Sequence, residues 1–213
     1  ASRVSPEKRA AEETARSRFR LIRDQAILKE FEALKKDAGL GGVYCVPSPE
    51  SLHVWHGVIF VRMRLFTEGT FKFTLTVPDN YPKEPPAVKF LSRVIHPLVA
   101  AGGEVDLSLF EKALPSGQLD TSIRTTLKNL KSIFYPSNSQ GGFVQFDMKL
   151  KNPDNMDKFR RDVKDCVAAA KDATFINPGN FSLRFSEFKQ PHEELLQAIL
   201  APLHKSVSDD EDD

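Results

Sequence analysis

The first hydrophobic pattern along the chain has the period of a helix. Between residues 14 and 37, apolar side chains recur every three or four positions and charged side chains fill the positions between them. The apolar set is Phe19, Ile22, Ala26, Ile27, Phe31 and Leu34. This spacing predicts an amphipathic helix with one apolar stripe, which ends at the glycines of positions 39, 41 and 42.

An alternating pattern follows the helical one. In residues 70–78, "TFKFTLTVP", every second residue is apolar, so one face of this strand is expected to be buried and the other to face water. Further strands are expected within residues 43–51, 52–64 and 87–92. A proline-rich turn precedes the last of them. The pattern therefore predicts four consecutive antiparallel strands.

Helical spacing returns in the second half of the chain. It predicts one helix over residues 123–134 and another over 152–175, with Asn152 as its cap and Pro153 at its first position. A short aromatic segment and one more helix are expected within residues 181–203. Strands grouped together, with helices grouped at either end, predict an α+β fold.

The length of the chain bounds the number of domains. With 213 residues and 40% hydrophobic content, we expect one core domain with extensions. The predicted parts are a flexible N-terminal arm (1–13), a core domain (14–175), an aromatic and helical extension (176–204) and a disordered acidic tail (205–213).

Charge and cysteine usage narrow the class of protein. Lys and Arg number 30 against 29 Asp and Glu, so no global field favours a nucleic-acid partner. The longest apolar runs are far shorter than the ~20 residues of a membrane span, so no direct membrane insertion is expected. The two cysteines form neither a disulfide framework nor a zinc motif. We expect a cytoplasmic protein without a metal or another cofactor.

The two cysteines and a pair of histidines are expected to have structural roles and no catalytic or metal-binding role. Cys45 falls in a predicted strand and Cys166 on an apolar helix stripe, where a free cysteine behaves as a small hydrophobe. His53 and His56 are three apart in an extended segment, so they are expected to point to opposite faces and not to share a metal.

Residues 73–97, "FTLTVPDNYPKEPPAVKFLSRVIHP", combine a strand, a Tyr-Pro-x-x-Pro-Pro turn, a second strand and a His-Pro pair. This order and spacing resemble the ubiquitin-conjugating enzyme family, and the resemblance covers roughly residues 14–175. It implies an α+β fold of the ubiquitin-conjugating type, with an N-terminal helix, a four-stranded antiparallel meander and C-terminal helices.

The resemblance also implies a degenerate catalytic site. In catalytic members Asn follows the His-Pro pair, and the cysteine that carries ubiquitin lies ten residues beyond the histidine. Here His96 and Pro97 are followed by Leu98, and Asp106 occupies the cysteine position within "GEVDLS". A carboxylate is a weak nucleophile and its acyl adduct would be a labile anhydride. Leu98 has no donor for a developing oxyanion. The resemblance thus implies that the chain is not an enzyme.

A narrower resemblance is carried by residues 51–82, by "HPLV" and "GEVDLS", and by "LRFSEFKQPHEELLQAIL". These stretches are similar to the Fused Toes family, also called Akt-interacting proteins, which are variants without the cysteine. The resemblance implies an adaptor that binds a Hook-type coiled coil and an FHIP-type scaffold and links vesicle or endosome cargo to dynein. It implies a cytoplasmic location, peripheral on endosomes or vesicles and associated with microtubules.

Two other functions stay open. The chain could bind ubiquitin noncovalently and partner an active conjugating enzyme to direct chain formation, since such variants also lack the cysteine. It could instead be an active enzyme that uses Cys45 or Cys166. Charging with activating enzyme, ATP and ubiquitin would reveal the second case as a reducible adduct, and none is expected.

The end of the chain holds two further candidate sites. Phe181, Phe185 and Phe188 either pack back onto the domain or form an aromatic anchor for a partner. Ser206 and Ser208 precede acidic residues, a spacing that acid-directed kinases favour, so they are candidate phosphorylation sites.

Overall fold

The computed structural model describes residues 6–110, 119–135, 153–177, 179–189 and 192–196. The chain forms two compact units, residues 1–183 and residues 184–213. In the second unit, residues 192–196 are helical, and the ring of Phe188 lies 5.8 Å from that of His192. Ser206 and Ser208 lie outside the described residues. The domain boundaries given above stay predictions.

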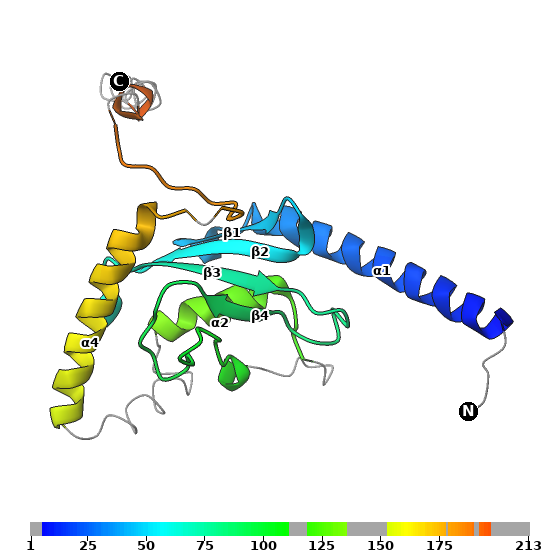
Figure 1. Cartoon of the computed structure of the whole chain (residues 1–213), viewed down its shortest axis with the longest axis horizontal. Helices are drawn as coiled ribbons and strands as arrows, with labels where there is room; N and C mark the ends of the chain where they lie inside the picture. Colours follow the sequence, from blue (N-terminus) through cyan, green and yellow to red (C-terminus); the bar gives the residue numbers. More distant parts are fainter. Residues whose placement is uncertain (1–5, 111–118, 136–152, 178, 190–191, 197–213) are drawn as a thin grey trace, which may run out of the picture. The chain divides into compact units, whose positions relative to one another are not determined.

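Four consecutive strands form one antiparallel sheet in the order β1-β2-β3-β4. They are β1 (Val43–Ser48), β2 (Ser51–Phe60), β3 (Thr70–Thr76) and β4 (Ala87–Phe90). Trp55 pairs with Leu75, and Phe73 pairs with Phe90, so these four side chains share one face, which we call the inner face. The predicted four-stranded meander is confirmed (Figure 1).

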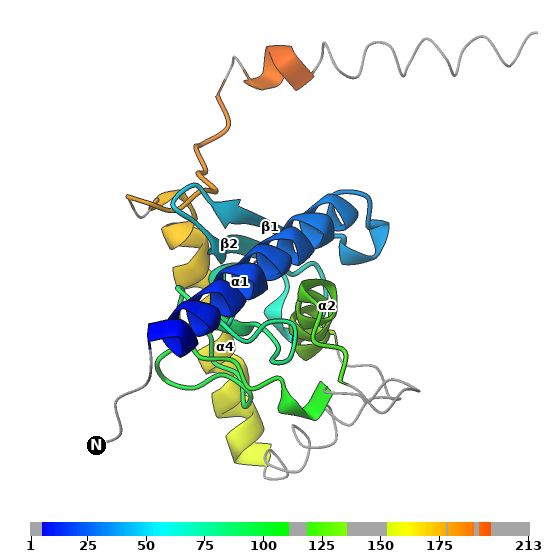
Figure 2. The same cartoon turned by 90° about the vertical axis from the view of Figure 1, so that its right-hand side faces the viewer.

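The inner face packs against α2 (Ile123–Phe134), whose bounds are those predicted from the sequence. Ser122 begins this helix, because its side chain accepts a hydrogen bond from the Thr125 N–H at 3.2 Å. The rings of Phe71 and Phe134 stack with centroids 5.4 Å apart. The hydrophobic core therefore lies between the sheet and α2, which Figures 1 and 2 show as adjacent layers.

The C-terminal half of α1 (Pro6–Leu34) packs against this core. Ile27 is fully buried, and the ring of Phe31 meets Trp55 edge-on at 5.5 Å. The carboxylate of Glu30 accepts a hydrogen bond from the Tyr81 hydroxyl and one from the Ile123 N–H at 2.8 Å. A carboxylate thus lies at the N-terminus of α2, where a negative charge is favourable.

The N-terminal half of α1 differs from the sequence prediction. The helix begins at Pro6, so it includes part of the stretch predicted as a flexible arm. Phe19 is 38% exposed and Ile22 is 59% exposed, although both belong to the predicted apolar stripe. Periodicity identifies the apolar side of a helix but not how far the rest of the protein covers it.

The last long helix of the first unit is α4 (Pro153–Asp172), with Pro153 at its first position as predicted. Its buried residues are Val163, Cys166 and Ala170. The thiol of Cys166 donates a hydrogen bond to the Arg93 carbonyl at 3.0 Å. This contact joins α4 to the chain that follows β4.

The chain that follows α4 covers the outer face of the sheet around Lys72, so the prediction of a wet face is wrong at Lys72, whereas Thr76 is exposed as predicted. Lys72 is only 4% exposed, and its ammonium donates to the carbonyls of Thr174 at 2.7 Å and Ile176 at 2.8 Å. His56 also lies on this face and contacts Ser182. We call residues 174–177 and 181–182 the outer-face segment, which Figure 1 shows on the side of the sheet opposite α2.

Candidate functional site

The loop with the His-Pro pair is built onto β4 by backbone hydrogen bonds. Phe90 N–H donates to the Gly103 carbonyl at 2.8 Å, and Val105 N–H donates to the Val88 carbonyl at 3.0 Å. Lys89 and Glu104, on facing positions, form a salt bridge of 2.7 Å. Residues 103–105 therefore run beside β4 and fix the position of Asp106, which follows them.

Gly103 is required by this arrangement. Its φ is +93°, a left-handed conformation that side chains rarely adopt, and a Cβ here would lie 2.4 Å from the Phe90 carbonyl oxygen. At Gly102 an added Cβ would instead meet the flexible side chain of Glu104. Of the two glycines, Gly103 lets the loop approach β4.

His96 is buried beneath the loop. Its Nδ1 accepts a hydrogen bond from the Leu98 N–H at 3.1 Å, and its ring lies 6.0 Å from Phe66 and 6.2 Å from Phe134. Burial lowers the pKa of His96 to about 4, although a backbone hydrogen bond with Ile133 opposes the shift. The imidazole is therefore neutral at pH 7 and orders the loop.

Asp106 lies exposed at the end of this loop, with its carboxylate engaged locally. Its Oδ1 accepts hydrogen bonds from the Ser108 N–H at 3.0 Å and from the Ser108 hydroxyl at 2.6 Å. These bonds lower the pKa of Asp106. The Asp106 N–H donates to the Leu98 carbonyl at 2.8 Å, so the structure brings together the two positions at which the resemblance places the degenerate site. The carboxylate thus accepts two hydrogen bonds from the first residue of the 3₁₀ helix Ser108–Phe110.

Neither cysteine of the chain lies in this loop. Cys45 lies in β1, and desolvation raises the pKa of its thiol well above the ordinary range. Burial also raises the pKa of Cys166, whose thiol is hydrogen-bonded to the Arg93 carbonyl. Both thiols are protonated near neutral pH, and a protonated thiol is a poor nucleophile.

A cavity of about 730 Å³ lies beside the loop. Its lining includes Arg93, His96 and Gly103 from the loop and Phe159 from α4. Among the described residues, no group of three or more His, Cys, Asp or Glu side chains is placed to hold a metal ion. The cavity can therefore offer shape and a few polar groups, and Asp106 is not among its lining residues.

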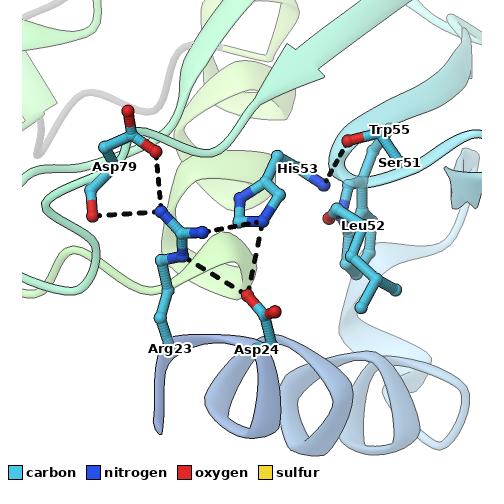
Figure 3. A network of polar contacts seen from close by, with 7 residues as sticks. All are labelled: Arg23, Asp24, Ser51, Leu52, His53, Trp55 and Asp79. Atoms are coloured by element: carbon cyan, nitrogen blue, oxygen red, sulfur yellow. Dashed lines mark hydrogen bonds and ion pairs between the residues drawn. The ribbon is translucent and has the colours of Figure 1, made fainter. Parts of the chain in front are cut away.

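The other candidate residues lie apart from this loop. His53 contacts Arg23 and Asp24 of α1 (Figure 3), whereas His56 contacts Ser182 on the outer face, so the two point to opposite sides as predicted. Phe181 is 3% exposed, and its ring stacks on His56 with centroids 4.7 Å apart.

Phe181 thus packs back onto the domain. Of the two possibilities predicted for it, this one applies and the aromatic anchor does not. In the second unit Phe188 is 66% exposed, and partner binding by Phe185 and Phe188 stays a prediction. Sequence reasoning missed the role of Ser182, whose N–H donates to His56 Nδ1 at 2.9 Å. Nothing in the sequence around Ser182 signals this contact, which joins residues 126 positions apart.

The family model of the ubiquitin-conjugating enzymes matches residues 26–167, which include the sheet, the loop and most of α4. The chain therefore belongs to the ubiquitin-conjugating enzyme family. The fold that the sequence predicted for it is confirmed.

Two relatives show to which group within the family the chain is similar. The chain is 29% identical to the crossbronx homolog of Anopheles gambiae, over 84% of this chain and 82% of that protein. It is 32% identical to the AKT-interacting protein of Danio rerio, over 88% of this chain but only 64% of the longer relative. The predicted resemblance to the Fused Toes family of AKT-interacting proteins is confirmed.

Among solved structures, human ubiquitin-conjugating enzyme E2 G1 matches 52% of this chain and 93% of its own, with 25% identity and a TM-score of 0.45. In the described part of the chain, no helix is both long and apolar enough to span a bilayer.

Proposed function

We propose that this chain is a noncatalytic member of its family that acts as an adaptor subunit between other proteins. The observation that carries the proposal is the state of Asp106. It stands at the position that the family resemblance assigns to the catalytic cysteine, and its carboxylate accepts two hydrogen bonds from Ser108. Leu98 stands at the position of the family's Asn.

The chemistry of ubiquitin transfer supports this proposal. A thioester carrier needs a sulfur that is nucleophilic near neutral pH and also a good leaving group, which a carboxylate is not. The Leu98 side chain offers no hydrogen bond to a developing oxyanion, and its backbone N–H already donates to His96. His96 is neutral and buried, and its Nδ1 accepts the hydrogen bond of the Leu98 N–H, so the imidazole orders the loop.

We infer the partners from the narrower family. AKT-interacting proteins are named for a protein partner, and the Fused Toes resemblance implies a Hook-type coiled coil and an FHIP-type scaffold. We propose that the chain joins such a complex and links vesicle or endosome cargo to dynein and microtubules. Its location would then be cytoplasmic and peripheral on those membranes.

The first experiment tests catalysis. The full chain is incubated with activating enzyme, ATP and ubiquitin, beside an active family member as positive control, and the products are separated with and without reductant. We expect no reducible adduct. An adduct that disappears in a Cys45→Ser or Cys166→Ser variant would contradict the noncatalytic assignment.

The second experiment tests the adaptor role. The full chain is mixed with C-terminal segments of Hook proteins and analysed by co-purification, and association at micromolar concentration is expected. No association at that concentration would reject the role. Titration of labelled ubiquitin, watched by NMR, tests the alternative, because localised shifts would favour a ubiquitin-binding variant and a flat titration would reject it.

A further inference from the structure

The N-terminal half of α1 presents apolar side chains that the described part of the chain does not cover. Every residue from 12 to 22 is exposed, and the buried residues of this helix begin at Arg23. The large apolar side chains are Phe19, Leu21 and Ile22, which are 38%, 65% and 59% exposed. Figure 1 shows this half of α1 extending past the sheet.

Part of this apolar surface has the spacing of a helix-pairing seam. Ala15, Phe19, Ile22 and Ala26 follow one another at intervals of four, three and four residues, the alternation of the two core positions of a coiled coil. At about 100° per residue the four side chains lie within about 60° of one another. We call these four residues the α1 seam. Its last residue, Ala26, packs partly against the core of the chain itself, so a partner would meet Ala15, Phe19 and Ile22. Leu21 and Leu28 lie on the opposite side of the helix.

Basic side chains flank the seam on both sides. The exposed residues 12–22 contain three arginines, and their two acidic residues, Glu12 and Glu13, precede the seam. Arg16 lies on one side of the seam and Arg18 on the other, and both are exposed. None of the ion pairs among the described residues engages Arg16, Arg18 or Arg20. A surface of this kind attracts a partner with acidic flanks.

The C-terminal end of the seam lies next to a point where α1 is anchored to the sheet. At that point the Arg23 guanidinium, 6% exposed, donates to Asp79 Oδ1 at 2.7 Å and to the Asp79 carbonyl at 3.2 Å. It also meets His53 Nε2 at 3.0 Å, as Figure 3 shows. Asp79 follows β3 and His53 lies in β2, so the point at which α1 leaves the sheet is held from two sides. A partner would meet a helix that is already ordered.

A second copy of the chain is a poor occupant for the seam. A second copy carries the same exposed Arg16 and Arg18 beside its own seam, so a pair of α1 helices would bring positive flanks together. Like charges at these flanking positions destabilise pairing. The charge pattern favours a different helix with the opposite charge.

We propose that the α1 seam binds an amphipathic α-helix of a partner protein, whose apolar stripe is flanked by acidic side chains, in a side-by-side pair of the coiled-coil type. The inference deepens the proposed adaptor function, on which it rests for its biological partner. The apolar stripe enters the seam beside Phe19 and Ile22, and its acidic flanks meet Arg16 and Arg18.

The test uses the full chain and a labelled 28-residue helical peptide as probe. Leu and Ile occupy the core positions of the peptide and Glu occupies every flanking position, so that like charges prevent it from pairing with itself. A control peptide carries Lys in place of Glu. Fluorescence anisotropy should give a micromolar Kd for the acidic peptide and binding at least about tenfold weaker for the basic one. Raising the salt concentration should weaken the binding of the acidic peptide, because salt screens its attraction to the arginines.

Matched variants separate the seam from the opposite side of α1. Phe19→Ser with Ile22→Ser should weaken acidic-peptide binding at least about tenfold, because two apolar contacts are lost. Leu21→Ser with Leu28→Ser should stay within about twofold of the wild type, since these exposed residues face away. Thermal melting checks folding, and neither pair should shift the melting temperature by more than about 2 °C, because all four side chains are exposed.

Four outcomes would overturn the proposal: no binding of the acidic peptide at 100 μM, equal binding of both peptides, unchanged binding by the seam variant, or a loss confined to the Leu21 and Leu28 variant. Removing residues 209–213 should leave the affinity unchanged. A tenfold rise on that removal would instead identify the chain's own acidic end as the occupant of the seam.

The peptide measurement can fail separately from the adaptor function. If Hook association survives Phe19→Ser with Ile22→Ser, the adaptor role stands and the seam is excluded as its surface. If the wild-type chain does not bind Hook segments, the adaptor role is rejected, and the peptide experiment still decides whether the seam pairs with acidic helices.

Discussion

His96 makes the stability of the chain depend on pH in a defined direction. Its pKa is about 4 in the folded protein and near 6.5 when exposed. Between these values the unfolded chain binds a proton that the folded chain does not, so the free energy of unfolding falls as pH decreases from about 6.5 to about 4. The loss attributable to His96 is about 3 kcal/mol over this window.

Urea denaturation at pH 7, 5.5 and 4.5 checks this expectation in the wild type and in His96→Gln. The variant should be less stable at pH 7, because the Leu98 N–H loses its acceptor, but its stability should decline less steeply with acid. Some decline should remain, since burial also lowers the pKa of His56. Parallel declines in both proteins would contradict the assignment.

Gly103 and Gly102 form a matched pair for testing the approach of the loop to β4. Gly103→Ala should destabilise the protein by about 2–3 kcal/mol or more, because its φ of +93° disfavours a side chain and the Cβ would collide with the Phe90 carbonyl. Gly102→Ala should cost less, since only the flexible Glu104 side chain must move. Equal midpoints of urea denaturation would show that the loop tolerates the collision.

At the scale of elements, Lys72 joins β3 to the outer-face segment. Lys72→Met keeps the apolar stem but removes the ammonium that donates to the carbonyls of Thr174 and Ile176, which should cost about 1–3 kcal/mol. Lys89→Met, on β4, is the control, because its surface salt bridge with Glu104 contributes about 1 kcal/mol or less.

Hydrogen exchange provides the readout specific to this element. In Lys72→Met the amide of Ser182, which donates to His56, should exchange faster than in the wild type. Unchanged protection of Ser182 would mean that the outer-face segment is held without Lys72.

The elements that the sequence predicted best are those whose pattern is complete within one segment. The bounds of α2 follow from apolar residues at helical spacing and from Ser122 before them, and β3 follows from strict alternation. Lys72 could not be predicted as buried, because its cover comes from residues about one hundred positions away. The exposed half of α1 was missed for the same reason, since a stripe does not reveal its partner.

Part of the candidate site could likewise be predicted from the sequence, and part could not. The resemblance implied the degenerate positions Leu98 and Asp106, and the structure adds that a backbone hydrogen bond joins them. The engagement of Asp106 by Ser108 depends on a local turn, and the neutrality of His96 on burial by Phe66 and Phe134. The neutrality of His96 therefore depends on tertiary packing, which the sequence alone does not reveal.

At the scale of the molecule, the boundary between the two units predicts where the chain can be shortened. Ending the chain after Leu183 should leave the melting temperature within about 2 °C, because the core residues all precede that point. Ending it after Asp172 removes the outer-face segment, including buried Phe181 and the acceptors of Lys72, and should lower the melting temperature by about 5–10 °C.

Calorimetry of the two shortened chains gives both values under the same conditions. A large drop for the chain that ends at Leu183 would mean that the second unit stabilises the first. Equal melting temperatures for the two chains would mean that the outer-face segment adds nothing to stability.

The outer-face segment also lowers the affinity of any partner that binds the outer face of the sheet. A protein that recognises this face must compete with residues 174–177 and 181–182 of the same molecule, which are always present. Its apparent affinity is its intrinsic affinity multiplied by the fraction of molecules in which the segment is released. If that fraction is about 1%, binding is weakened about a hundredfold, and a change that frees the segment would restore it.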